Sequence, residues 1–315
     1  MTRLVAVTGA TGFLGGYIVE ALIAAGWRVR ILARQARDYP QHAGLDFETV
    51  LGDLADRPAL DRLVDGADAV VHAAGLIKAA DMATFRAVNV GGTANLIAAV
   101  NDCPTPKHLI LVSSMVAREP RLSAYAETKR ESEAALSSLR RGGWTVVRPC
   151  AVYGPWDRET LAIFQSAARG IFPLAGPRHG RVALIHASDA ARAVASLCGQ
   201  EGAGQVFELT DQRVEGYAWD EIAAAAAQAA GGRVVKLPLP AIAVRWAAAV
   251  NMAAARLIGR TPMLTSGKAR EILHSDWGSA AERQPPPDLW RPRIGLEDGF
   301  RDTVTWYRNQ DWLPK

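Results

Sequence analysis

Cysteine is scarce in this sequence, and nothing in its placement suggests a disulfide framework or a metal site. The 315 residues include three cysteines, Cys103, Cys150 and Cys198, which lie far apart along the chain. An odd number of widely spaced cysteines is typical of free thiols in a reducing compartment. We therefore expect a cytoplasmic protein that binds no metal ion.

Dense runs of positive charge are also absent. The formal net charge is +4 and the pI is about 9.1, but the lysines and arginines are spread along the chain. Proteins that bind nucleic acids usually concentrate basic residues into a block or stripe that neutralises phosphates. We therefore expect no nucleic-acid partner.

No hydrophobic run is long and uninterrupted enough to predict a membrane span. The chain enters a strand pattern at residues 4–7 without the charged head, long apolar stretch and cleavage site of a signal peptide. Residues 237–258 come nearest to a span, but two prolines open the segment and polar residues interrupt it: Arg245, Asn251 and Arg256. We predict an amphipathic helix here. Its Trp246 and flanking arginines also suit loose contact with a bilayer, which leaves a peripheral location at the inner face of the membrane open.

The sequence does contain enough apolar residues for a large core, because 49% of it is hydrophobic and 22% charged. In the first half, short apolar strands alternate with longer helical patterns. Strands are predicted near residues 3–8, 28–33, 46–50, 68–72, 108–112 and 144–148. Helices are predicted near residues 12–26, 56–65, 83–102 and 123–141. This rhythm predicts an α/β fold with a doubly wound parallel sheet.

A glycine-rich segment follows the first predicted strand at once and opens the first helix. It reads Gly9-Ala10-Thr11-Gly12-Phe13-Leu14-Gly15, one residue longer than the general dinucleotide fingerprint. Gly9 permits the tight turn, Gly12 lets the backbone approach a pyrophosphate, and Gly15 lets the helix pack closely on the sheet. The alternative is a merely structural turn. We predict a dinucleotide site with these contacts: Gly9, Thr11, Gly12, Phe13, Leu14 and Gly15.

The ends of the next two strands bear on the choice of cofactor. An acidic residue after the second strand would bind the ribose 2′-hydroxyl and favour NAD. The sequence has Ala33 and Arg34 there, and an arginine can pair with a 2′-phosphate, with help from Arg37. We therefore expect NADP(H) to be preferred and NAD(H) to remain usable, the alternative being a solvated arginine. Asp53, after the third strand, could accept a hydrogen bond from the adenine amino group.

Tyr125 and Lys129 are four residues apart on a predicted helix, so their side chains share one face. Ser114 ends the preceding predicted strand, where parallel sheets place their ligands. A phenol is a poor acid–base catalyst at neutral pH, but a nearby ammonium lowers its pKa. The pattern predicts that Tyr125 exchanges a proton with a substrate oxygen held by Ser114.

Asn89 lies in the third predicted helix, in Val88-Asn89-Val90-Gly91-Gly92-Thr93. Its side chain could support a water molecule in a proton relay. A helix-capping asparagine is an equally good interpretation of the local sequence.

Together the motifs resemble the extended short-chain dehydrogenase/reductase family over nearly the whole chain. They occur in family order: Thr8 to Gly15, Gly52-Asp53-Leu54, His72-Ala73-Ala74-Gly75, Asn89, Ser114, Tyr125 with Lys129, Arg148-Pro149 and Val152-Tyr153-Gly154-Pro155. The resemblance implies a Rossmann-like domain over residues 1–150 and a smaller substrate-binding lobe over residues 151–315, interleaved with the end of the sheet. It further implies these cofactor contacts: Asp53, Leu54, Ala73, Ala74 and Gly75 on the adenosine side, and Val112, Tyr125, Lys129, Pro149 and Val152 around the nicotinamide. Ser114, Tyr125 and Lys129 would be catalytic.

Two departures bear on the substrate. Nucleotide-sugar epimerases and dehydratases of this family usually have a longer segment between the serine and the tyrosine than the present one. They also commonly carry a diphosphate-binding arginine where this chain has Ala183, although Arg178 and Arg181 lie nearby. The second half contains large apolar residues such as Phe164, Phe172 and Trp246, which would suit a bulky apolar substrate if they line a cleft.

The leading hypothesis is therefore an NAD(P)H-dependent reductase for the ketone of a small hydrophobic molecule, steroid-like or a 3-keto lipid such as a ketoceramide. The resemblance is nearest to the branch of 3β-hydroxysteroid dehydrogenases, dihydroflavonol reductases and complex I accessory subunits. A nucleotide-sugar epimerase or dehydratase is the first alternative, and a non-catalytic NADPH-binding structural or assembly protein is the second. Either a monomer or a homodimer is compatible with the sequence.

Overall fold

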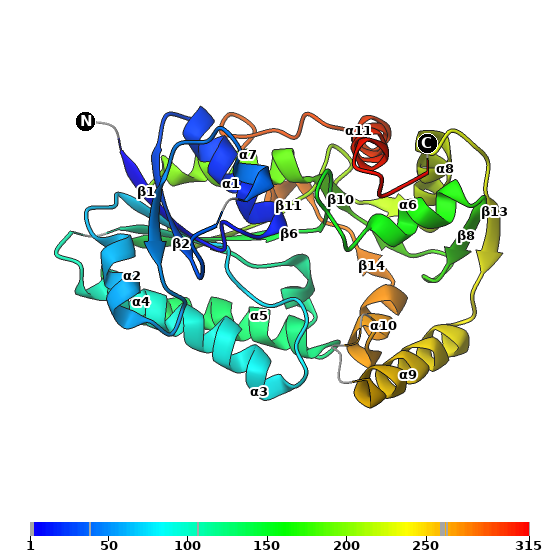
Figure 1. Cartoon of the computed structure of the whole chain (residues 1–315), viewed down its shortest axis with the longest axis horizontal. Helices are drawn as coiled ribbons and strands as arrows, with labels where there is room; N and C mark the ends of the chain where they lie inside the picture. Colours follow the sequence, from blue (N-terminus) through cyan, green and yellow to red (C-terminus); the bar gives the residue numbers. More distant parts are fainter. Residues whose placement is uncertain (1–2, 38, 106, 259–261, 263, 315) are drawn as a thin grey trace. The chain divides into compact units, whose positions relative to one another are not determined.

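The computed structural model describes residues 3–314 apart from 38, 106, 259–261 and 263 (Figure 1). The chain forms two compact units. The first, here the sheet unit, comprises Met1–Pro149, Ala190–Leu209 and Pro285–Trp290. The second, here the lobe unit, comprises Cys150–Asp189, Thr210–Gln284 and Arg291–Lys315. The chain therefore passes between the two units several times.

The sheet unit is built on a seven-stranded parallel sheet, which confirms the predicted doubly wound, Rossmann-like fold. The strand order is β11-β6-β5-β4-β1-β2-β3. The strands are β1 (Leu4–Thr8), β2 (Arg28–Ala33), β3 (Glu48–Leu51), β4 (Ala69–His72), β5 (His108–Val112), β6 (Gly143–Pro149) and β11 (Gln205–Leu209). Every residue of β1, β4 and β5 is buried, as expected for central strands that are covered on both faces. The first six strands lie where the apolar runs predict them.

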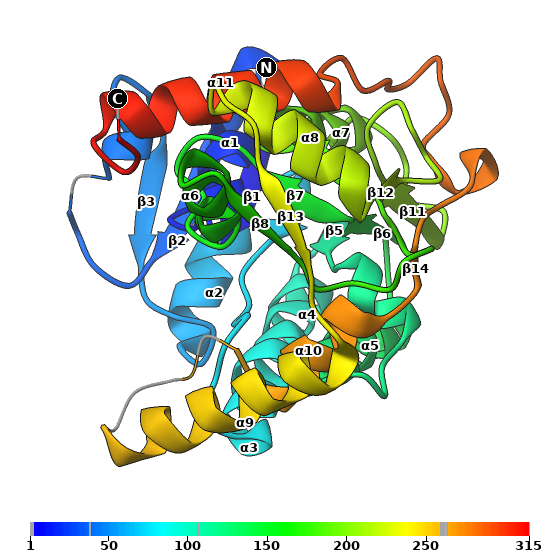
Figure 2. The same cartoon turned by 90° about the vertical axis from the view of Figure 1, so that its right-hand side faces the viewer.

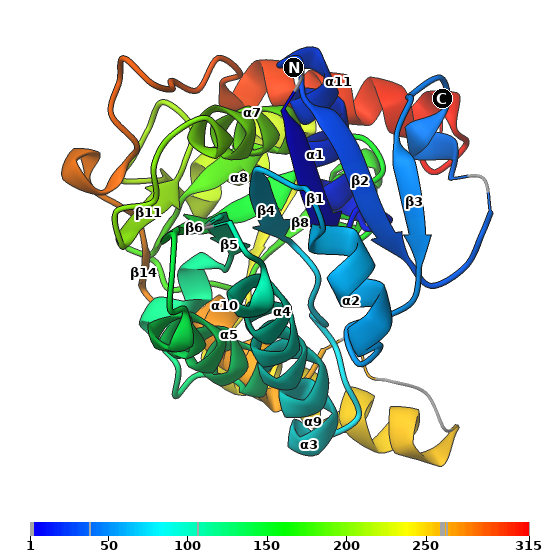
Figure 3. The same cartoon turned by 90° about the vertical axis from the view of Figure 1, so that its left-hand side faces the viewer.

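Helices cover both faces of this sheet (Figure 3). They are α1 (Phe13–Ala24), α2 (Arg57–Val64), α3 (Met82–Phe85), α4 (Gly92–Asp102), α5 (Ala124–Ala135) and the greater part of α7 (Ala187–Cys198). Short turns of other helical types complete the unit: η1 (Pro40–His42), η2 (Arg86–Gly91), η3 (Met115–Arg118) and η4 (Leu136–Ser138). The apolar faces of α2 and α4 pack on the sheet through fully buried leucines such as Leu60 and Leu96.

The register of the strands sets which residues meet at the carboxyl edge of the sheet. Thr8 at the end of β1 lies beside His72 at the end of β4, and His72 lies beside Leu111 near the end of β5. Parallel strands bring their carboxyl ends to one edge, where α/β proteins of this type bind ligands. The glycine loop, the segment after His72 and the Ser113-Ser114 pair all start from this edge.

The lobe unit contains short strands and helices of its own (Figure 2). Its strands pair as β7 (Ala151–Tyr153) with β10 (Leu184–His186), and β8 (Ile171–Leu174) with β13 (Val235–Pro238). A small sheet joins β12 (Tyr217–Ala218), β9 (Arg181–Val182) and β14 (Asp276–Trp277). The helices are α6 (Leu161–Ala168), α8 (Trp219–Ala229), α9 (Ala241–Leu257), α10 (Ser266–Leu273) and α11 (Leu296–Asn309), and η5 (Ala281–Arg283) is a short turn.

Phe164 and Phe172, considered above as residues that could line a cleft, belong to the core of this unit. They are 0% and 2% exposed and pack with Tyr153, Phe300 and Tyr307. The predicted amphipathic helix is α9, which starts at Ala241 because residues 235–238 form a strand instead. Among the described residues, no helix has the length and apolar character needed to cross a bilayer.

Candidate active site

The glycine loop is closed so tightly that only its middle remains accessible. Gly9 has a φ of 76°, and a Cβ atom placed on it would lie 2.4 Å from the backbone nitrogen of Ala74. A Cβ atom on Gly15 would lie 1.9 Å from the carbonyl oxygen of Gly9. Side chains are therefore excluded at both positions. Gly12 is exposed, and a Cβ atom placed on it would have one near neighbour, the carbonyl oxygen of Gly9 at 3.3 Å.

The amino end of α1 fits a bound phosphate. Gly12 is the N-cap residue, no side chain caps the helix, and no acidic residue lies in its first turn. The amides of that turn therefore have no competing anion in the helix itself, and the helix dipole favours negative charge there. Thr11 is exposed, whereas Phe13 and Leu14 are half-buried. The chain thus presents a backbone cradle that suits the pyrophosphate of a dinucleotide.

Arg34 and Arg37 follow β2 on the neighbouring strand. Val7 of β1 pairs with Ile31 of β2, and β2 ends at Ala33, so Arg34 follows at the same edge of the sheet as the glycine loop. Arg34 is exposed and makes no ion pair with any residue that the structure describes. The guanidinium of Arg37 lies 4.9 Å from the centre of the Tyr39 ring.

Asp53 and Leu54 follow β3. One carboxylate oxygen of Asp53 accepts hydrogen bonds from the amides of Ala55 and Asp56, at 2.8 and 3.2 Å. The second oxygen accepts none from the described part of the chain. Leu54 packs against Gly92 at the start of α4, where a Cβ atom would lie 2.5 Å from the leucine methyl group. The two residues therefore fix the β3 loop against the helix and leave one carboxylate oxygen for a ligand.

A chain of neutral hydrogen bonds, here the His72 chain, links the glycine loop to η2. The hydroxyl of Thr8 lies 2.6 Å from Nδ1 of His72, and Nε2 lies 2.9 Å from the hydroxyl of Thr93. The Thr93 hydroxyl donates to the carbonyl oxygen of Asn89 at 2.6 Å. Because the Thr93 hydroxyl donates its proton to Asn89, it can only accept a hydrogen bond from His72. His72 is therefore protonated on Nε2, and its Nδ1 accepts a hydrogen bond from the Thr8 hydroxyl.

This arrangement requires an uncharged imidazole. His72 is 1% exposed, and burial lowers the pKa of its side chain from 6.5 to about 3, with a further contribution from the positive charge of Lys129. The amide of Ala74 also donates to the Thr8 hydroxyl, at 3.4 Å. The His72 chain therefore holds the segment containing Ala73, Ala74 and Gly75 against the end of β1, on the adenosine side of the predicted site.

Asn89 lies within the helical run, in the wide turn η2, and not at a helix start. Its side chain accepts from the amide of Leu76 at 2.7 Å, and it donates to the Leu76 carbonyl and the Thr128 hydroxyl, both at 3.1 Å. Its backbone carbonyl accepts hydroxyl hydrogen bonds from Thr93 and Ser132, at 2.6 and 2.9 Å. Wide helical turns of this kind are frequent at functional sites. Here Asn89 ties the segment after β4 to α5, and its relay water remains a prediction.

Tyr125, Lys129 and Glu133 follow one another at four-residue intervals on α5, and we refer to them as the α5 column. Tyr125 is half-buried, with its ring centre 6.5 Å from that of Phe85. Lys129 is buried and donates to the carbonyl oxygen of Val112 at 2.8 Å. Burial lowers the pKa of Lys129 from 10.5 to about 8, although the carboxylate of Glu133 opposes this effect.

Glu133 extends the column into a buried ion pair. It accepts from Arg148 on β6 through two hydrogen bonds of 2.8 and 2.6 Å, a bidentate arrangement. It also accepts from the hydroxyl of Ser113 at 2.5 Å. The Glu133 and Arg148 side chains are 8% and 11% exposed. Sequence reasoning missed the role of Glu133, although its spacing of four residues from Lys129 is a usable signal.

The structure separates the two serines that end β5. Ser113 is buried and uses its hydroxyl on Glu133. Ser114 is half-buried and begins η3, where its hydroxyl oxygen accepts a long hydrogen bond of 3.4 Å from the Val116 amide. Its proton is therefore not committed to that contact, so Ser114 is the member of the pair that can donate to a ligand.

The predicted residues of the sheet unit thus come from neighbouring strand ends and the helices that follow them. Gly75 illustrates this, because a Cβ atom on it would lie 3.3 Å from the side-chain oxygen of Asn89 and 3.6 Å from Nζ of Lys129. Pro149 is the last residue of β6. Val152 lies on β7 in the lobe unit, where it pairs with Ile185.

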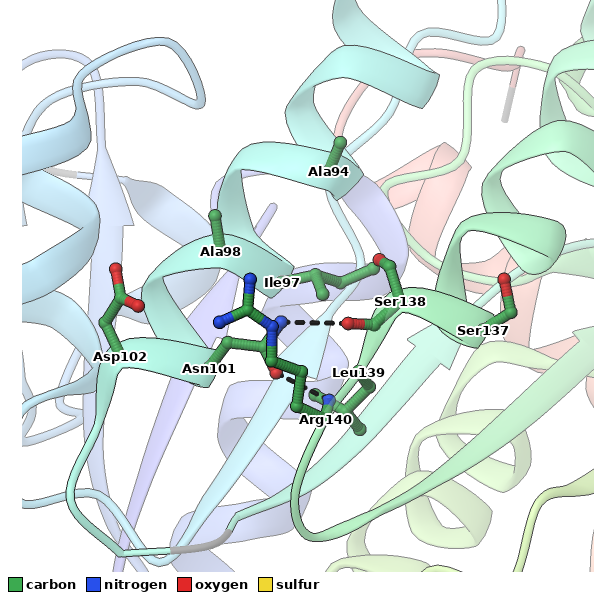
Figure 4. A pocket seen from close by; sticks show the side chains of 9 residues that line it. All are labelled: Ala94, Ile97, Ala98, Asn101, Asp102, Ser137, Ser138, Leu139 and Arg140. Carbon is green, nitrogen blue, oxygen red and sulfur yellow. Dashed lines mark hydrogen bonds between the residues drawn. The ribbon is translucent and has the colours of Figure 1, made fainter.

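A surface hollow between α4 and η4 lies apart from these residues (Figure 4). Asn101 donates to the carbonyl oxygen of Ser138 at 2.9 Å and accepts from the amide of Arg140 at 2.7 Å. The hollow lies where α4 and α5 end, near the start of β6 and away from the carboxyl edge of the sheet. We assign these contacts to bracing the α5–β6 connection.

Comparison with known proteins adds an independent result. The sequence profile of the NAD dependent epimerase/dehydratase family matches residues 5–209. A ceramide reductase of Caulobacter vibrioides is 43% identical over 99% of this chain and 96% of the relative. A 3 beta-hydroxysteroid dehydrogenase/Delta 5→4-isomerase of Mycobacterium tuberculosis is 28% identical, covering 77% of this chain and 73% of the relative.

Among solved structures, the fold is similar to that of DesIV, a dTDP-glucose 4,6-dehydratase from Streptomyces venezuelae with NAD bound. The TM-score is 0.73 at 23% identity, covering 99% of both chains. The comparisons confirm the resemblance drawn from the motifs and the expected enzyme class, an NAD(P)-dependent enzyme acting on a CH–OH or C=O group. The chain belongs to the NAD-dependent epimerase/dehydratase family.

Proposed function

We propose that this enzyme reduces the ketone of a hydrophobic substrate, a 3-keto lipid such as a ketoceramide or a steroid-like molecule. The observation that carries the proposal is the α5 column, in which the buried cation of Lys129 lies one helical turn from the half-buried phenol of Tyr125. Burying a lysine lowers the stability of the fold, so fold stability does not explain this arrangement. It is the arrangement that a phenolic acid–base catalyst needs.

In the proposed reaction, Ser114 donates a hydrogen bond to the ketone oxygen and orients it. A reduced nicotinamide dinucleotide held by the glycine loop would supply the hydride for the carbonyl carbon. Tyr125 donates its proton to the same oxygen, so that the C=O group becomes CH–OH and a phenolate remains. Lys129 stabilises that phenolate, because an ammonium ion beside a phenol lowers the pKa of the phenol. In this proposal, residues 1–150 bind the cofactor and residues 151–315 the substrate.

The lobe unit supports a substrate other than a sugar diphosphate. Ala183, at the position where related sugar enzymes commonly carry an arginine, is fully buried. Arg181 forms an ion pair with Glu221, at 3.3 Å. The similarity to a ceramide reductase over nearly the whole chain supports the same choice.

For the cofactor we propose a preference for NADPH over NADH. Arg34 supports it, because it is exposed at the end of β2 and is not neutralised by any described acidic residue. Replacing Arg34 by alanine should weaken NADPH binding by roughly tenfold and leave NADH binding nearly unchanged, since one charge-assisted hydrogen bond is lost. Titration of both cofactors measures the ratio. An unchanged ratio would show that the 2′-phosphate is not bound there.

We further propose that the enzyme works at the cytoplasmic face of the membrane, as a monomer or a homodimer. Light scattering on the purified protein distinguishes the two oligomeric states.

The test of the proposed reaction is a substrate panel with NADPH or NADH. The panel contains keto-lipids, ketosteroids and UDP- and dTDP-sugars. It is run with the wild type, with Tyr125→Phe and, as a control, with Tyr17→Phe, which changes a half-buried tyrosine of α1. We expect turnover of the hydrophobic ketones, a loss of about 1,000-fold in Tyr125→Phe and little change in the control. Turnover of sugars alone would contradict the proposal, and NADPH binding without any turnover would favour a structural protein.

A further inference from the structure

The outward face of α9 is a stripe of exposed apolar side chains. Ile242, Trp246 and Val250 are 58%, 66% and 63% exposed. They recur at intervals of four residues, so they lie on one face of the helix. Ala249 and Ala253, also exposed, fall on the same face at this spacing.

The opposite face of α9 already has its packing partners. Val244, Ala248 and Ala255 are no more than 6% exposed. The first two form an apolar cluster with Ala269 of α10, and α10 packs along α9 in Figure 2. A surface helix of a globular protein normally needs one apolar face, for its own core. The second apolar face of α9 is therefore not explained by the stability of the lobe unit.

The strand that leads into α9 is exposed in the same way. Val235 and Leu237 on β13 are 63% and 44% exposed, and Ile171 on β8, which pairs with Val235, is 48% exposed. Residues 235–258, together with Ile171, supply most of the exposed large hydrophobic side chains in the described part of the chain: Ile171, Val235, Leu237, Leu239, Ile242, Trp246, Val250 and Ile258. Scattered exposed residues are normal, whereas such a concentration marks an interaction surface.

Positive charge accompanies this apolar surface. Residues 232–274 contain seven basic residues and one acidic residue: Arg233, Lys236, Arg245, Arg256, Arg260, Lys268 and Arg270, against Glu271. Arg245 is exposed on α9 beside the apolar stripe. Within the described residues, neither Arg245 nor Arg233 forms an ion pair, while Lys236 and Lys268 pair with Asp220 and Glu271.

We propose that α9, with the exposed edge of β13, docks on an anionic lipid bilayer. Interfacial helices of this kind insert an apolar face that includes tryptophan and keep basic residues at the level of the headgroups. The charge argues for a bilayer over a second copy of the chain, because two identical basic surfaces would repel each other. The proposal names the surface behind the membrane location proposed above. It extends the proposed function by giving a water-insoluble substrate a place of delivery, but it does not depend on catalysis.

The test is flotation of the full chain with lipid vesicles. Vesicles of phosphatidylcholine alone are compared with vesicles that also contain phosphatidylglycerol, at low and high salt. We expect binding to the anionic vesicles, weakened by salt because exposed charges are screened. The double variant Ile242→Gln/Trp246→Gln should bind at least about tenfold less, and Arg245→Glu roughly tenfold less.

Matched controls separate the surface from general effects. Val206→Gln removes a side chain 41% exposed on β11, and Arg62→Glu makes the same charge reversal on α2. Both should bind vesicles like the wild type, and all variants should keep the wild-type melting temperature. Wild type that fails to float, or a double variant that floats equally well, would overturn the proposal.

A dimer that the double variant abolishes, without vesicle binding by the wild type, would instead assign the surface to a second copy of the chain. Reduction of a short-chain, water-soluble ketone by NADPH is measured without vesicles on the same proteins. That activity should be unchanged in all of them, so failure of docking and failure of the proposed reaction give different results.

Discussion

Two buried polar networks of the sheet unit differ in how they hold the predicted site. The His72 chain is neutral, and it joins the end of β1 to η2 through hydroxyls and one uncharged imidazole. The α5 column carries full charges on Lys129 and Glu133, and Glu133 pairs with the charged Arg148 of β6. The first network lies at the glycine loop and the second at the proposed reacting groups.

The difference indicates which task each network serves. Cofactor binding needs a backbone of fixed shape, and neutral hydrogen bonds supply shape without a dependence on pH near neutrality. Proton transfer needs an electrostatic field, and a nearby positive charge lowers the pKa of a phenol. The two networks should therefore respond differently to substitution and to pH.

The largest effect should come from removing the cation of the α5 column. Lys129→Met should lower kcat/KM by about 1,000-fold, because Tyr125 loses the charge that stabilises its phenolate. It should nevertheless stabilise the fold at pH 7. Lowering the pKa of Lys129 from 10.5 to about 8 corresponds to roughly 3 kcal/mol of destabilisation when the lysine is charged. Loss of the hydrogen bond to Val112 offsets about 1 kcal/mol of the gain.

The sign of the pH dependence tests this explanation. Below pH 8 the folded and unfolded states both hold the proton, so the variant keeps its full advantage of about 2 kcal/mol. Between pH 8 and 10.5 only the unfolded state holds it, and the wild type becomes more stable as the pH rises. Denaturant unfolding across this range measures the difference. A constant difference would show that Lys129 is not held at a lowered pKa.

The next largest effect should distinguish the reacting serine, Ser114, from the structural one, Ser113. Ser114→Ala should lower kcat/KM by about 100-fold, because a hydrogen bond to the reacting oxygen is lost. Ser113→Ala is the matched control, since its hydroxyl already serves Glu133. It should cost about 1 kcal/mol of stability and change kcat/KM only a few-fold. Equal losses of activity in both variants would contradict the assignment of Ser114.

Much of this organisation could be predicted from the sequence. The glycine spacing, the six apolar runs and the interval from Tyr125 to Lys129 are local patterns, and local patterns determine strands, turns and helix faces. The first six strands and the family follow from them. The seventh strand, β11, does not, because it follows a long excursion of the chain into the lobe unit and no local signal gives its partner.

The networks themselves depend on contacts between distant residues. Thr8 and His72 are 64 positions apart, and Glu133 meets Arg148 from another element. The sequence shows His72 and Arg148 within motifs, but only the strand register shows what each side chain contacts. Ser113 and Ser114 are adjacent and identical, so the sequence does not distinguish their roles. At the end of β5 their side chains point to opposite sides, and their hydroxyls therefore have different partners.

The smallest effect should come from the neutral network. Its dependence on pH should have the same sign as that of Lys129, because both folded-state pKa values are lowered, but it should appear at lower pH, below 6.5. His72→Gln keeps a donor and an acceptor in poorer geometry, so it should cost about 1–2 kcal/mol of stability at pH 7.5.

The pH dependence tests whether His72 is neutral. Below pH 6.5 the His72 side chain binds a proton in the unfolded wild type but not in the folded state, where its pKa is about 3. The wild type therefore loses up to about 1.4 kcal/mol per pH unit through this residue, and the variant does not. The two unfolding free energies should meet roughly one pH unit below 6.5. Because burial also lowers the pKa of His42 and His108 in both proteins, their contributions cancel in this difference. A difference that stays constant from pH 7.5 to 5 would mean that His72 is not held neutral.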